Sequence, residues 1–293
     1  GSSPSSGDYS GTPAPPTGEL PEPETITVPA GQTRTFNVGP GEDFANKLID
    51  ITSNGSGIKI NTNGGGWSVR NIGLKGPQDG GPRAMFTPGV PAGESALIDQ
   101  VYFGDGTNLS TSRQTCIWVN ANMPHQGTLK ITRSHFAHWA DNAVYGSGPG
   151  TTAGPNAGKV HIEDCFARNN NISCYRLGTN GSYVKNSVAI CDGPLQAVPN
   201  GKNSRGIYIK EGASCLAEGC NIHFPSSCGG SNNAVLVASG SLTLRDCNIS
   251  AGRVSGNITR ENVGKDTDLS PPAGVPMSAE QAVKEAGSGG GGG

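Results

Sequence analysis

The stretch SLTLRDCNIS, residues 241–250, decides the fold because its hydrophobic alternation is interrupted once. Leu242 and Leu244 alternate with polar residues, as in a strand that buries one face. The polar pair Arg245-Asp246 then breaks the period, and the inward pattern resumes at Cys247. We interpret the stretch as two short strands joined at a corner, with the polar pair on the corner and Cys247 pointing inward.

The same pattern recurs along the chain, which is the mark of a repeat architecture. The other segments are SVRNIGL (68–74), LIDQVYF (97–103), LKITRSHF (129–136), VHIEDCFA (160–167), YVKNSVAI (183–190) and CLAEGCNI (215–222). The residues that match Cys247 run from Ile72 in six steps, so the repeat averages about 29 residues.

A second strand-like segment precedes most of these, across a turn rich in Gly. These segments are GIKIN (57–61), AMFT (84–87), CIWVN (116–120), AVYG (143–146), CYRLG (174–178), GIYIK (206–210) and AVLVA (234–238). Each unit therefore reads as strand, turn, strand and variable loop.

One such unit cannot bury its apolar side, whereas stacked units can. Two-residue hairpin turns, typical of a sandwich or meander, are scarce. The sequence therefore predicts an all-β fold, a right-handed parallel β-helix (solenoid) of about seven rungs. At about 4.8 Å per rung its core would be roughly 34 Å long.

The remaining segments suggest flanking regions. Residues 1–24 are rich in Ser, Gly and Pro and are expected to form a flexible tether. Residues 25–56 are expected to be an N-terminal cap with a short helix or an extra strand, followed by the β-helix over 57–260. Residues 261–286 are expected to be a C-terminal cap whose short helix opens at a capping box, Ser278 to Gln281, and covers the last rungs. Residues 287–293 are a Gly-rich linker, natural or engineered.

Four segments carry a resemblance to a known superfamily: FANKLIDITSNGSGIKI (44–60), GWSVRNIGLKG (66–76), GTLKITRSHFAHWADNAVYGS (127–147) and GKVHIEDCFARNNNISCYRLGTNGS (158–182). Over about residues 28 to 286 the chain resembles right-handed β-helix proteins of the pectate-lyase-like superfamily. More narrowly, it is similar to β-helix proteins frequent among secreted and viral proteins of halophilic archaea. The resemblance implies the fold, and a groove along one parallel sheet as the place where polysaccharide would bind.

Composition excludes several classes of function. The net charge of −2 leaves no basic stripe for nucleic acid. The sequence also contains no run of 18 apolar residues that could span a membrane. The eight cysteines contain no CxxC pair, so no zinc site and no cofactor are expected, with Ca²⁺ as a secondary expectation.

Three of the cysteines, Cys165, Cys220 and Cys247, fall at one inward position and are expected to be small buried thiols. A Cys220–Cys247 or a Cys215–Cys228 bridge is compatible with the spacing, and the sequence leaves both open.

The second strand series presents an outward row with an unusual composition. The expected outward residues are Lys59, Phe86, Trp118, Tyr145, Arg176, Tyr208 and Leu236. In a chain with only 5% aromatic residues, this row would place four rings on a single sheet, with Arg176 among them. Flat rings at rung spacing suit stacking on sugar faces, and Arg176 suits pairing with a uronate or sulfate. A covering loop (147–158) or a subunit contact would explain the same row.

Enzymes of the resembling superfamily need carboxylates that hold Ca²⁺ with an Arg base, or clustered carboxylates for acid–base hydrolysis. The predicted row contains no Asp or Glu. The catalytic candidates are therefore its neighbours Asp141 and Glu211, with Arg176 and His138.

These observations favour a non-catalytic, extracellular module of a cell surface or virion, such as an adhesin or spike, that binds polysaccharide. The alternatives are a polysaccharide lyase or glycoside hydrolase acting on uronate-rich polysaccharide, and a structural filament or spike subunit that forms a homo-oligomer.

Overall fold

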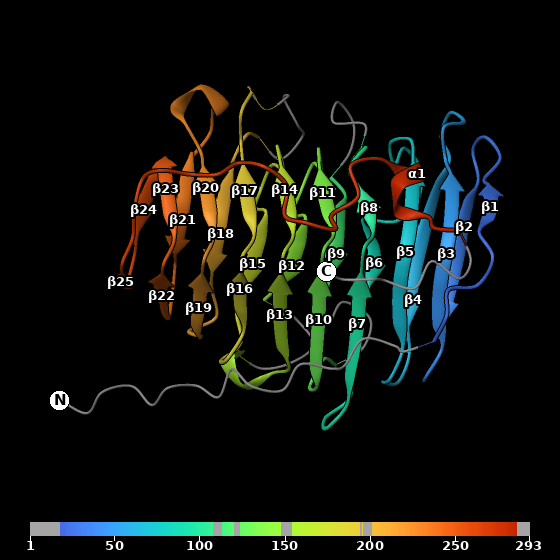
Figure 1. Cartoon of the computed structure of the whole chain (residues 1–293), viewed down its shortest axis with the longest axis horizontal. Coiled ribbons are helices and arrows are strands. Elements are labelled where there is room, and N and C mark those ends of the chain that lie inside the picture. The colour runs from blue at the N-terminus through green and yellow to red at the C-terminus, as the bar shows by residue number, and fades with distance from the viewer. Residues whose placement is uncertain are drawn as a thin grey trace.

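The computed structural model describes residues 18–107, 113–119, 124–147, 154–193, 195 and 201–285. The described chain is all-β, with 25 strands, two short 3₁₀ segments and one short helix, α1 (Ala279–Ala282). The strands stand side by side along the long axis of the molecule (Figure 1). They form two long parallel sheets, so the predicted fold class is confirmed at the level of a solenoid-like stack of parallel strands.

The first sheet, sheet B, has nine strands in chain order. They are β2 (Thr33–Val38), β4 (Gly57–Thr62), β6 (Ala84–Thr87), β9 (Thr115–Trp118), β12 (Val144–Gly146), β15 (Tyr175–Leu177), β18 (Arg205–Ile209), β21 (Asn233–Val237) and β24 (Arg253–Ser255). The seven predicted segments of the second series correspond to β4, β6, β9, β12, β15, β18 and β21, and β2 and β24 add one strand at each end.

The other sheet, sheet A, has two arms that meet at β5 (Ser68–Lys75). One arm contains β7 (Ser95–Asp99), β10 (Thr128–Thr132), β13 (Lys159–Glu163), β16 (Tyr183–Lys185), β19 (Ser214–Glu218), β22 (Ser241–Arg245) and β25 (Ile258–Glu261). The second arm contains β8 (Tyr102–Phe103), β11 (His135–Ala137), β14 (Phe166–Arg168), β17 (Val188–Ile190), β20 (Asn221–His223) and β23 (Asn248–Ala251).

Strands also fill the segment expected to be an N-terminal cap. β1 (Glu24–Thr27) pairs with β3 (Asp43–Asp50), and β3 pairs with β5, all in parallel. Residues 25–56 therefore extend the two sheets by extra strands, one of the two forms expected for this segment.

The corner interpretation of the opening stretch is confirmed. β22 ends at Arg245, Asp246 adopts a left-handed φ of 51°, and β23 starts at Asn248. Asn and Asp tolerate this backbone region better than other non-Gly residues. A left-handed residue recurs at the matching place in the other units: Asn46, Asn71, Gln100, Arg133, Asp164, Asn186, Gly219 and Asn262.

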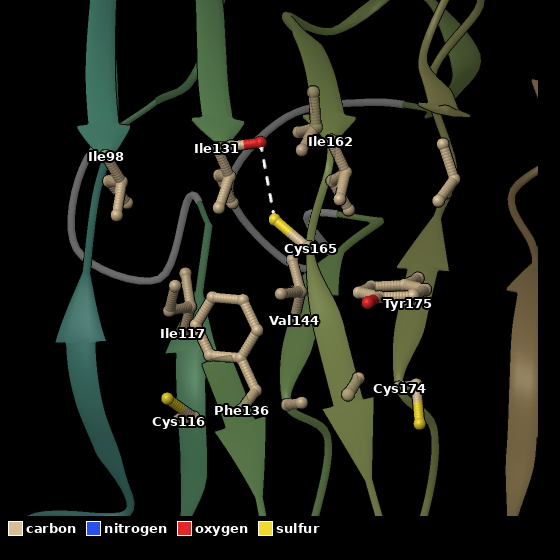
Figure 2. Close-up of a cluster of buried hydrophobic side chains, with 14 of the residues drawn as sticks. Ile98, Cys116, Ile117, Ile131, Phe136, Val144, Ile162, Cys165, Cys174 and Tyr175 are labelled. Carbon is tan, nitrogen blue, oxygen red and sulfur yellow. Dashed lines mark hydrogen bonds between the residues drawn. The ribbon is translucent and has the colours of Figure 1, made fainter. Parts of the chain in front are cut away.

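Aligned apolar columns fill the interior between the sheets. Ile98, Ile131 and Ile162 lie on neighbouring strands of sheet A and are fully buried (Figure 2). The Cys165 thiol, just beyond that column, donates to the Ile131 carbonyl at 3.7 Å. Phe136 packs into the same cluster. Each unit thus supplies side chains that the next unit covers, which is what a solenoid core requires.

The predicted inward thiol column is confirmed, because Cys165, Cys220 and Cys247 are free and buried. Both suggested bridges are wrong, since Cys215, Cys220 and Cys247 carry free thiols. The disulfide instead joins Cys191 and Cys228, with Cα atoms 6.0 Å apart. Both of these residues lie outside the repeated strands, Cys191 in a loop and Cys228 at the end of a 3₁₀ segment, where the sequence period gives no register.

Removal of this disulfide by the double change Cys191→Ser and Cys228→Ser is expected to lower the free energy of unfolding by about 4 kcal/mol, the loop-closure value for its 37-residue separation. Urea titration of the variant and the oxidised wild type measures the difference. Dithiothreitol should destabilise the wild type and leave the double variant unaffected. An equal effect of the reductant on both proteins would contradict this assignment.

The chain after β25 forms a C-terminal strap, residues 265–285, that runs back along the second arm of sheet A (Figure 1). Val275 and Leu269 pack on the outward side chains of Phe166, Val188 and Ile190. The expectation that the helix covers the last rungs is wrong: α1 packs on β3, β5 and β8 at the N-terminal end.

The reason for this path lies in the sheet below the strap. The outward row of this arm is apolar at Tyr102, Phe166 and Val188, so it requires a cover that hides it from water. Hydrogen bonds fix the strap at its far end, where Asn46 Nδ2 donates to the Lys284 carbonyl at 2.8 Å and Asn71 Nδ2 to the Ala282 carbonyl at 3.0 Å.

Acid is expected to destabilise the fold through three buried histidines, His125, His135 and His161. Burial lowers the pKa of each to about 4. The unfolded chain binds these protons below its ordinary histidine pKa of about 6.5, whereas the folded chain does not. The contribution of these histidines to the free energy of unfolding is therefore fully present above pH ~6.5. It is lost as the pH drops toward about 4, by up to about 3 kcal/mol per histidine.

Urea midpoints at about pH 7.5 and about pH 5 measure this loss. His135→Gln, which removes one titrating group beneath the strap, should show a smaller difference between the two midpoints. Equal midpoints for the wild type at both pH values would contradict the account.

Candidate functional site

Four outward side chains lie next to one another on adjacent strands of sheet B. Trp118 on β9 pairs in register with Tyr145 on β12, Tyr145 with Arg176 on β15, and Arg176 with Tyr208 on β18. We call these four residues the sheet-B ladder. The parallel register places them in one row, because equivalent positions of successive units stack directly on each other.

Phe86 is a correction to the predicted row. It pairs with Ile60 and Ile117, points inward, has no exposed surface and packs on Trp67 with ring centroids 6.3 Å apart. The outward place on β6 belongs to Thr87. The segment AMFT is buried throughout and shows no alternation, so its phase was not readable, and a one-residue error turns every side chain to the other face.

The ladder consists of three rings, with one cation between Tyr145 and Tyr208. The Trp118 and Tyr145 rings stack with centroids 5.0 Å apart and an interplanar angle of 27°. The Arg176 guanidinium carbon lies 3.9 Å from the Tyr145 centroid and 5.2 Å from that of Tyr208. Cation–π attraction of this kind holds a guanidinium flat against its neighbours.

Arginines also lie at both ends of the ladder, and sequence reasoning did not find them. Arg83 lies 5.9 Å from the Trp118 ring, and Arg205 lies 4.5 Å from the Tyr208 ring. Arg83 immediately precedes β6 and Arg205 begins β18, so neither occupies the outward row that the sequence pattern identified. Their signal in the sequence was only a positive charge close to two of the strands.

Two N–H groups of this region have no hydrogen-bond partner within the described residues. They are Trp118 Nε1 and Arg205 Nε, and both atoms are buried. A buried donor without an acceptor costs about 1–3 kcal/mol.

The cation is held in a defined orientation. Arg176 Nε donates to Ser147 Oγ at 2.7 Å, and its Nη2 lies 3.9 Å from Glu211 Oε1. Arg176 is 8% exposed, while Trp118 and Tyr145 are half-buried. A guanidinium fixed in this way loses little conformational entropy when it binds an anion, and its partial burial strengthens the attraction.

Of the catalytic candidates, three surround Tyr145 and one does not. Burial and the charges of Asp141 and Glu211 raise the pKa of the Tyr145 hydroxyl, and the Arg176 charge lowers it. Asp141 is itself buried, which raises its pKa, and lies 3.9 Å from Arg83. His138 instead feels the charges of other residues, those of the Arg168, Asp192 and Asp105 side chains.

The described residues contain no group of three or more His, Cys, Asp or Glu side chains placed to hold a metal ion. In the same part of the chain, no helix is long and apolar enough to cross a membrane. Comparisons with protein-family models, with curated proteins and with solved structures found no match to this chain.

Proposed function

We propose that this protein is a non-catalytic binding module that holds an acidic polysaccharide along the sheet-B ladder. The observation that carries the proposal is the register of Trp118, Tyr145, Arg176 and Tyr208 on four adjacent strands. A row of rings perpendicular to the strands matches a linear chain of flat sugar rings, which aromatic faces bind through their apolar C–H surfaces.

The charge pattern of the ladder suggests which polysaccharides would bind. The ladder presents one cation, Arg176, between its rings. A further cation lies at each end, Arg83 beside Trp118 and Arg205 beside Tyr208. Guanidinium groups pair with carboxylates and sulfates through two parallel hydrogen bonds. Uronate or sulfated glycans therefore fit the ladder better than neutral ones.

We further propose an extracellular location, on a cell surface or a virion, and membership of the pectate-lyase-like superfamily with a right-handed coil of seven central rungs. The Cys191–Cys228 disulfide supports an oxidising compartment. The right-handed coil is supported by the strong general preference of parallel strand connections.

A glycan array with neutral, uronate and sulfated chains tests the binding function. The wild type should bind acidic chains, and Trp118→Ala should weaken the same spots at least about tenfold, through the loss of stacking. Ser255→Ala, in the same row beyond Tyr208, is the matched control and should bind like the wild type. No binding to any acidic chain, or unchanged binding by Trp118→Ala, would refute the proposal.

A second candidate function, cleavage of uronate-rich polysaccharide, is favoured by the buried Asp141 and by Glu211 near Arg176. Burial raises the pKa of the Asp141 carboxyl, as a general acid requires. Incubation of the protein with polyuronate distinguishes the two functions, because a lyase releases unsaturated ends and a hydrolase releases reducing sugar. Binding without either product supports the module, and turnover abolished by Asp141→Asn supports the enzyme.

A further inference from the structure

Within the described residues, sheet B has an unpaired strand edge at each end of the stack. β2 is the last strand of sheet B at the N-terminal end, and β24 is the last at the C-terminal end. Most of their residues are exposed, unlike those of the central strands. Among the described strands, β24 pairs only with β21, so its outer edge has no strand partner there. Open parallel edges of this kind invite another strand.

Apolar side chains lie at both open ends of one inward column. The column runs from Phe36 on β2 to Val254 on β24 through paired residues of every strand of sheet B. Phe36 and Val254 are only partly buried, although the residues between them are fully buried. At the C-terminal end the core opens into a cavity of about 280 Å³ lined by Ile249, Val254, Val263 and Arg260, among others.

The N-terminal end carries more acidic than basic side chains, whereas the cavity at the C-terminal end is lined by two basic ones. Residues 18–47 contain five acidic and two basic side chains. Arg260 and Lys265 line the cavity, and within the described residues neither makes an ion pair. Opposite charges attract when the N-terminal end of one copy meets the C-terminal end of another, whereas two C-terminal ends repel.

We propose that copies of this chain associate head to tail, with β2 of one copy added in parallel to β24 of the next. This arrangement continues the Phe36–Val254 column and directs the half-buried Phe36 toward the cavity beside Val254. It also brings the acidic N-terminal end of one copy against Arg260 and Lys265 of the next. Because the two surfaces differ, the contact does not close on itself, and the copies form a linear filament. The proposal does not depend on glycan binding by the ladder.

Two variants, each with one end blocked, test this arrangement by sedimentation velocity. The mean mass of the wild type should rise with concentration and fall with added salt. Phe36→Lys blocks the N-terminal end (the head), and Val254→Lys blocks the C-terminal end (the tail). Each variant alone should stay monomeric over the concentration range in which the wild type associates. An equimolar mixture should form dimers and nothing longer, because only one competent head and one competent tail remain.

Thr243→Lys adds the same charge to the side of the stack and is the matched control, so it should associate like the wild type. If Phe36→Lys does not fold, Glu42→Lys at the exposed head replaces it and should weaken association at least tenfold. A wild type that is monomeric at every soluble concentration overturns the proposal. So does self-association of the head variant at wild-type strength, which would indicate a tail-to-tail contact.

Discussion

Gly73→Ala is expected to displace the C-terminal strap and to lower the free energy of unfolding by about 3 kcal/mol. A Cβ atom at Gly73 would overlap the carbonyl oxygen of Ala279 in α1 and lie 2.6 Å from its carbonyl carbon. These are backbone atoms, so no side-chain rotation relieves the clash. Gly73 lies outside the left-handed backbone region, so alanine itself is not strained there.

Urea titration measures the stability change, and limited proteolysis measures the release of residues 265–285. Once displaced, the strap exposes the row that contains Tyr102, Phe166 and Val188 to water. Gly193→Ala is the matched control, because a Cβ there meets no atom of the described residues within 4 Å. An unchanged urea midpoint together with a protease-resistant strap would show that α1 does not pack on β5 in this way.

Arg176→Gln is expected to lower the affinity for an acidic glycan by about tenfold to a hundredfold, the usual range for loss of a hydrogen bond to a charged group. Glutamine removes the charge and the fork of N–H donors from between Tyr145 and Tyr208. Affinity for a neutral glycan of the same length should change far less. Competitive binding with both glycans gives the comparison.

The conservative change Arg176→Lys sharpens this prediction. Lysine keeps the positive charge and loses the planar group that stacks on Tyr145, so its affinity should fall between those of the wild type and Arg176→Gln. Thermal unfolding of each variant verifies that the fold persists. Equal loss for acidic and neutral glycans would show that Arg176 only supports the neighbouring rings.

The repeated strands were predictable because their information is local. Alternation in a segment such as SLTLR identifies a half-buried strand, and the polar pair that ends at Asp246 identifies a corner. Once units stack in parallel, register follows from the pattern, which predicts Trp118, Tyr145, Arg176 and Tyr208 in one row, as the strand pairing has them.

The remaining features depend on contacts between distant residues. The Cys191–Cys228 pair joins two segments outside the repeated strands, and the strap brings Lys284 back to Asn46. Neither contact produces a repeating residue pattern in the sequence from which it could be predicted. Phe86 was misplaced because its strand lacks the alternation that reveals phase. Arg83 and Arg205 approach the rings from positions just outside the predicted row.

Tryptophan fluorescence during titration with a uronic-acid oligosaccharide tests the central claim most directly. Trp67 and Trp139 are 1% and 0% exposed in the core, and Trp118 is half-buried in the ladder. If the ladder binds the oligosaccharide, the wild type shows a saturable fluorescence change that disappears in Trp118→Phe, while that variant still binds through its substituted ring. No change in the wild type, or the same change in Trp118→Phe, would contradict this claim.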